Sequence, residues 1–236
     1  FLISFQLGSP VLGVLGAILV GLLFNLFLAW MYIDVKANQV VVGIIFNLMA
    51  LGLTSFASRA ILGAQARPQK AAMFHELHLP LLSDIPILGP IFFSHSILVY
   101  ITFALVFVSG FVLYRTKFGL KLRAVGEHPR AADTAGINVF RIRYIGVLIS
   151  GAAAGMAGAY LVLSQLGIFR DNIVAGRGFI ALAIVIFGRW NPYKAAIAAL
   201  VFGAADALQL SLQIFAFNIP PQLLLSLPYV LTILAM

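Results

Sequence analysis

The chain has no cysteine and few charged residues. None of its 236 residues is a cysteine, which excludes disulfides and thiolate chemistry. Only 9% are Asp, Glu, Lys or Arg, whereas soluble domains average about 25%. The motifs HExxH, GxSxG and GxxxxGK[ST] are also missing. The sequence therefore argues against an ordinary water-soluble domain, a familiar hydrolase centre and a P-loop of its own.

Long apolar runs fill the rest of the sequence, which is 62% hydrophobic. A helix needs about 20 apolar residues to cross a bilayer, whereas a barrel strand needs only about ten that alternate. The runs predict an all-α, polytopic bundle of transmembrane helices, with spans at 10–33, 40–58, 96–114, 144–166, 195–217 and 222–236. A seventh run, at 178–188, is half long enough, so it is either one half of a broken helix or a span that borrows flanking residues. We expect one transmembrane domain over residues 1–236, truncated at both ends.

The basic residues predict how the helices are oriented. A net charge of +8 is compatible with nucleic-acid binding, but in a membrane protein Lys and Arg collect in cytoplasmic loops. Segment 115–143 holds seven of them against two acidic residues, which places it in the cytoplasm. Alternation then places segment 59–95 outside, with 82–93 along the membrane surface. His75 and His78 in this segment leave a metal pair open, but a solvated loop is favoured and no metal site is predicted.

Polar residues inside the spans are costly and often functional. Asp206, Gln209 and Gln213 recur on one face of the 195–217 helix, and Asn47 lies in the 40–58 span. They either line a polar cavity or join helices by hydrogen bonds. Gly176 and Gly178 precede the short run and fit either a helix N-terminus deep in the membrane or a plain interfacial turn. We take these six as candidate residues of a solute path. Gly151 and Gly155, by contrast, form a GxxxG pattern that predicts close helix packing.

One short polar stretch carries its own helix start and stop, at residues 126–139, GEHPRAADTAGINV. His128 suits an N-cap and Pro129 the first helical position, while Gly136 suits the position just after a helix end. The stretch predicts a helix of two turns, from Pro129 to Ala135. Such a short helix is not stable alone in water, so something must dock against it.

The composition of that helix predicts how it docks. Ala131, Ala132 and Ala135 would form one smooth face against a partner's groove, and Arg130 and Asp133 would pair at i, i+3. The alternative is an ordinary loop helix packed on its own bundle.

Four stretches resemble a known family: LRAVGEHPRAADTAGINVFRIRY (122–144), AGRGFIALAIVIFGRWNP (175–192), FGAADALQL (202–210) and PPQLLLSLPYVLT (220–232). They are similar to the permeases of ABC importers for branched-chain amino acids, simple sugars and nucleosides. Among these they look most like the simple-sugar and nucleoside permeases that work with a basic membrane lipoprotein. The resemblance covers nearly the whole chain, but a family member would begin earlier and end later.

The resemblance implies a transport subunit and not an enzyme. It implies a multi-pass permease in the plasma (inner) membrane that carries a nucleoside or simple sugar and binds no nucleic acid. A cytoplasmic ABC ATPase would hold ATP and Mg, so this chain would bind no cofactor. The other partners would be a second permease subunit, forming a heterodimer, and an extracellular solute-binding lipoprotein. The ATPase would contact the coupling loop within 115–143, through Gly126, Glu127, His128, Pro129, Arg130, Ala131, Ala132, Asp133 and Gly136.

The residues themselves leave another function open. A self-sufficient channel or ion-coupled carrier would use Asp206 as its proton or cation site. A membrane enzyme is opposed by the lack of clustered catalytic side chains.

Overall fold

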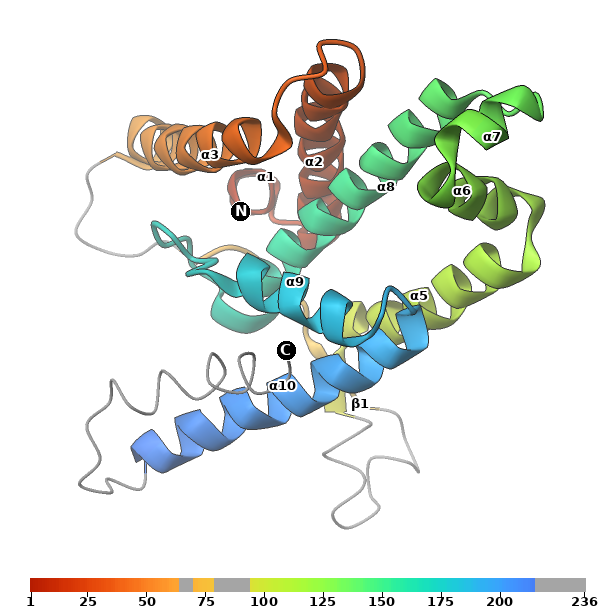
Figure 1. Cartoon of the computed structure of the whole chain (residues 1–236). Coiled ribbons are helices and arrows are strands. Elements are labelled where there is room, and N and C mark those ends of the chain that lie inside the picture. The colour runs from red at the N-terminus through yellow and green to blue at the C-terminus, as the bar shows by residue number, and fades with distance from the viewer. Residues whose placement is uncertain (64–69, 79–93, 215–236) are drawn as a thin grey trace. The chain divides into compact units, whose positions relative to one another are not determined.

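The computed structural model describes residues 1–63, 70–78 and 94–214, and Figure 1 shows that these are mostly helical. Five helices in these ranges are long and apolar enough to cross a membrane. They are α2 (Pro10–Ile33), α3 (Gln39–Leu62), α5 (Ile97–Arg115), α8 (Val139–Tyr160) continued by η1 (Leu161–Leu166), and α10 (Pro192–Ile214). All five lie where the apolar runs predict spans, so the all-α membrane fold is confirmed. The predicted features at 82–93 and 222–236 lie outside the described residues.

The chain divides into two compact units, each with its own packing. The first unit contains residues 1–102 and 117–173. The second contains residues 103–116 and the chain from 174 onward. Helix α5 begins in the first unit and ends in the second.

Close contact between α2 and α8 forms the centre of the first unit. A β-carbon on Gly151 would lie 2.6 Å from the carbonyl oxygen of Gly21, and one on Gly155 would lie 2.8 Å from the carbonyl carbon of Ala17. Only glycine lets the two backbones approach this closely. The GxxxG prediction is therefore confirmed for this pair, whereas Gly158 faces open space.

The far end of α8 widens into a π-helix, η1, and stops at Gly167, whose φ is 67°. The side chain of Leu163 is fully buried there, in an apolar cluster with Ala71, Ala159 and Val162. Backbone hydrogen bonds hold residues 71–74 against this end, from Phe74 N–H to the Leu163 carbonyl at 3.0 Å and from Ala71 N–H to the Gly167 carbonyl at 2.8 Å. The short helix α1 (Leu2–Leu7) is also attached there, because the Ser4 hydroxyl donates to the Ala72 carbonyl at 2.9 Å. Where segment 59–95 is described, it also pairs β1 (Glu76–His78) antiparallel with β2 (Ser94–Ser96).

The second unit packs α9 (Arg177–Phe187) and α10 with the latter half of α5. Helix α9 has 11 residues, which confirms the short apolar span expected at 178–188. The ring of Tyr193 in α10 lies directly over Gly110 of α5, where a β-carbon would come within 2.7 Å of it. One face of α10 is buried and consists of Ala198, Phe202, Ala205 and Gln209.

Candidate functional site

The predicted coupling loop folds into two helices before α8 begins. Helix α6 (Lys117–Glu127) precedes α7 (Pro129–Thr134). Helix α7 starts as predicted, with His128 at its N-cap and Pro129 in its first turn, and it ends one residue early, at the cap residue Ala135. Gly136 follows with a φ of 79°, the left-handed conformation expected just after a helix end. The sequence did not predict α6, although Phe118, Leu122 and Val125 follow helical spacing.

Helix α7 docks on its own chain through one alanine. Ala132 is buried together with Val125 of α6 and Ile142 of α8. Ala131 and Ala135 are exposed. The prediction that the three alanines form one docking face is therefore wrong, because α6 and α8 occupy the side on which Ala132 lies.

The charged side chains of α7 point away from this small core. Arg130 and Asp133 are both exposed, and the predicted ion pair between them is not formed; among the described residues the ion pair present is that of Arg59 with Asp171. Exposed pairs gain little, because water screens them and ordering long side chains costs entropy. Both charged groups therefore remain available to a partner. Gly126 and Glu127, at the end of α6, are exposed as well.

A hydrogen bond joins this loop region to the end of α2. The hydroxyl of Tyr144, in the second turn of α8, donates to the carboxylate of Asp34, which caps the C-terminus of α2. A carboxylate at a helix C-terminus is unfavourable against the helix dipole, so a donor there offsets a local cost. Helix α8 thus connects the α6–α7 core to α2 through this bond and through the glycine contacts further along.

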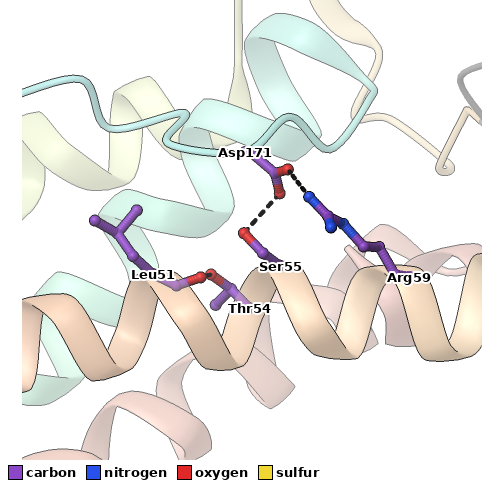
Figure 2. A network of polar contacts seen from close by, with 5 residues as sticks. All are labelled: Leu51, Thr54, Ser55, Arg59 and Asp171. Carbon is purple, nitrogen blue, oxygen red and sulfur yellow. Dashed lines mark hydrogen bonds and ion pairs between the residues drawn. The ribbon is translucent and has the colours of Figure 1, made fainter.

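Helix α3 carries a polar network near its C-terminal end, shown in Figure 2. The Ser55 hydroxyl donates to one carboxylate oxygen of Asp171 at 2.8 Å, and a guanidinium nitrogen of Arg59 lies 3.6 Å from the other. Thr54 instead donates back to the Ala50 carbonyl at 2.7 Å. The network ties α3 to the loop between η1 and α9, on the side that the sequence predicts to be outside.

The network is polar and exposed, so it contributes little to stability. The side chains of Arg59 and Asp171 are 76% and 53% exposed, and such a pair is worth at most about 1 kcal/mol. Sequence reasoning missed it because the partners are more than 100 residues apart in the chain. The signal available in the sequence was an Asp in a polar loop and an Arg directly after the predicted span 40–58.

The candidate path residues fall in both units, and each is described within its own. Asn47 is exposed on α3, next to Phe46, whose ring packs against Phe24 and Phe27 of α2. In α10, Gln209 is 4% exposed and Asp206 is half-buried at the edge of the same face. No hydrogen bond joins Gln209 to a residue in the described part of the chain. The side chain of Gln213 lies outside the described residues.

The start of α9 has two left-handed residues and a glycine that no neighbouring atom covers. Gly176 caps the helix with a φ of 79°, and Ala175 before it is also left-handed, with a φ of 44°. Nothing lies within 4 Å of a β-carbon placed on Gly178. Along residues 1–63, 70–78 and 94–214, no three His, Asp or Glu side chains gather as metal ligands would.

Comparisons with known proteins agree with this arrangement. The family described as "Branched-chain amino acid transport system / permease component" matches residues 1–236. The guanosine ABC transporter permease protein NupQ of Bacillus subtilis is 44% identical over 97% of this chain and 72% of its own length. The nucleoside ABC transporter permease protein NupC of Lactococcus lactis is 38% identical over 97% and 73%. The putative glucose ABC transporter permease protein TsgC13 of Haloferax volcanii is 35% identical over 94% and 67%. The comparison with solved structures gave no match.

The family match and the relatives lead to one assignment, and the helices of membrane-spanning length agree with it. The chain belongs to the family of branched-chain amino acid transport system permease components.

Proposed function

We propose that this permease carries a nucleoside or a simple sugar into the cell as part of an ATP-driven importer. Relatives named for guanosine, nucleosides and glucose support this solute class. We place the chain in the plasma membrane, paired with a different second permease and supplied by an extracellular binding lipoprotein. Segment 115–143 would face the cytoplasm and segment 59–95 the outside.

The observation that carries the coupling proposal is the way α7 is held. Ala132 fixes the helix to α6 and α8, while Arg130 and Asp133 project outward. The energy would come from a partner ATPase that holds ATP and Mg, which the relatives named as ABC transporter permeases support. Helix α7 would be the contact of that ATPase, together with Gly126, Glu127 and Gly136.

Motion at α7 would pass into the membrane through α8. The α6–α7 core includes Ile142 in the first turn of α8. Further along, Gly151 and Gly155 hold α8 directly against the backbone of α2. This close packing leaves no room for one helix to slide along the other. A displacement of α7 would therefore move α8 and α2 together, as a rigid element with two positions.

We assign six residues to the solute path: Asn47, Asp206, Gln209, Gln213, Gly176 and Gly178. Gln209 supports this best, because a buried amide without a hydrogen-bond partner gains most from a polar solute, and Gln209 has no such partner among the described residues. Asp206 beside it would accept hydrogen bonds from hydroxyl groups of the solute.

The alternative, a self-sufficient carrier that uses Asp206, is not favoured. All three relatives described above are named as ABC transporter permeases, which work with an ATPase. Asp206 is half-buried, and this exposure is compatible with a polar contact to a solute.

Solute competition tests the proposed substrate class. Cells that express the permease with its ATPase, second permease and lipoprotein should accumulate labelled guanosine, since two of the three relatives are named for nucleosides. An excess of unlabelled nucleosides should remove most of this uptake, and glucose should not. Competition by glucose alone would reassign the solute to sugars. If neither compound is taken up or competes, the proposed solute class is wrong.

A further inference from the structure

The turn between α9 and α10, residues 188–191, is short and tightly held. Gly188 packs under the start of α10, where a β-carbon would lie 2.6 Å from the Ala195 nitrogen. The Asn191 side chain accepts hydrogen bonds from the N–H groups of Tyr193 and Lys194, at 3.0 and 3.3 Å. These contacts fix the turn, so its outward side chains have defined positions.

Two non-glycine residues of this turn adopt left-handed backbone conformations. Arg189 has a φ of 53° and Trp190 a φ of 59°, a region that side chains with a β-carbon disfavour. Both side chains are exposed, and Trp190 is 74% exposed. Glycine would fit this backbone more easily, so the strain indicates that these outward side chains have a use of their own.

The turn lies beside the latter half of α5, whose C-terminal end leads into α6. Tyr193, in the first turn of α10, covers Gly110 and approaches the Phe107 ring at 6.3 Å between centroids. The basic segment 115–143 begins directly beyond this end of α5. Alternation of the spans likewise places 189–194 on the cytoplasmic side.

The charge on this turn is entirely positive. Arg189 and Lys194 are both exposed, and the sequence has no Asp or Glu between Arg177 and Asp206. Tryptophan favours the membrane–water interface, and cations near it are attracted to anionic lipids of the cytoplasmic leaflet. The turn has four residues between two apolar helices, so it has little room to project beyond the headgroups. The coupling loop, by contrast, contains two helices, α6 and α7.

We propose that Arg189, Trp190 and Lys194 bind anionic phospholipid headgroups at the cytoplasmic surface. This contact would set the depth of α9. Its 11 residues span about 16 Å, roughly half of a hydrocarbon core of about 30 Å. With its C-terminal end held at the headgroups, its first residues, beside Gly176, would lie near the bilayer midplane. The depth argument rests on the membrane-embedded fold; the cytoplasmic side of the contact and a role for Gly176 in transport rest on the proposed function.

Fluorescence quenching can measure this, because the chain has only two tryptophans, Trp30 and Trp190. The Trp30→Phe variant leaves Trp190 as the sole reporter in the purified full chain. It would be reconstituted into phosphatidylcholine vesicles with or without phosphatidylglycerol. Some of the lipids would carry a nitroxide quencher, either near the headgroup (the shallow label) or near the end of the acyl chain (the deep label). We expect strong quenching by the shallow label, weak quenching by the deep label and little by aqueous iodide.

The cations are tested in the same system. Replacing Arg189 or Lys194 by Gln should lower the preference for spin-labelled phosphatidylglycerol over phosphatidylcholine at Trp190, by up to about fivefold per cation. In the Trp190→Phe variant the fluorescence comes from Trp30. The same Gln substitutions made in that variant should not change the lipid preference. The secondary structure of each variant, checked by circular dichroism, should be unchanged because both side chains are exposed.

Three outcomes would overturn the proposal. Quenching mainly by the deep label or mainly by iodide would place Trp190 away from the headgroups. An unchanged lipid preference in both Gln variants would remove the role of the cations. Protection of Trp190 from iodide only when the ATPase is added would assign this surface to a protein partner. None of these results depends on solute transport, so a failure here is distinct from a failure of the proposed function.

Discussion

Replacing Arg130 and Asp133 together by tyrosine should abolish ATP-driven uptake while the permease still inserts and folds. Both side chains are exposed on α7, and the core contact of the helix is made by Ala132, which is left intact. If the pair anchors the ATPase as interface anchors commonly do, the loss is about 2 kcal/mol or more, at least about 30-fold in affinity. Uptake and co-purification of the ATPase measure the two effects.

A charge-preserving variant is the matched control for this prediction. Arg130→Lys with Asp133→Glu keeps both charges and the helix, so uptake and ATPase binding should persist. Membrane levels and melting temperature should match the parent in both variants. Normal uptake in the tyrosine double variant would show that α7 does not receive the ATPase.

Substituting leucine for Gly155 should separate α2 from α8 and destabilise the first unit. A β-carbon at this position already overlaps the backbone of Ala17 and lies 3.1 Å from the Cα of Ile18, so the helices must move apart. Overpacking in a tight interface costs about 1–3 kcal/mol, which corresponds to a fall of roughly 2–12 °C in melting temperature. Thermal unfolding of the purified permease in detergent would measure it.

Gly158 provides the comparison for Gly155. It lies in the same helix one turn later, it is exposed, and nothing lies within 4 Å of a β-carbon there. Gly158→Leu should therefore leave the melting temperature nearly unchanged. An equal fall in melting temperature at the two glycines would mean that contact with α2 does not determine the result, because leucine has the higher helix propensity at both positions.

The membrane helices were predictable because their signal is local. Apolar length predicts a span, and the five described spans agree with the runs in the sequence. The start of α7 and its approximate end were predictable for a similar reason, since Pro129 and Gly136 act through backbone geometry at their own positions. The short α9 was visible too, because its apolar run is bounded by glycine at both ends.

The remaining features depend on contacts between distant residues. The inward side of α7 is decided by α6 and α8, so the alanine pattern alone misassigned Ala131 and Ala135. Helix α6 was missed because its basic residues looked like those of a loop. The π-helix η1 and the Asp171 network carry no local signature, since each depends on segments that fold against it.

Cysteine accessibility at α7 tests most directly whether the ATPase holds this helix from the cytosol. The chain contains no cysteine, so Ala131→Cys gives a single thiol on the exposed side of α7. A membrane-impermeant maleimide should label it in inside-out vesicles and not in intact cells, and bound ATPase should protect it. Labelling from outside intact cells, or labelling that the ATPase leaves unchanged, would contradict the account.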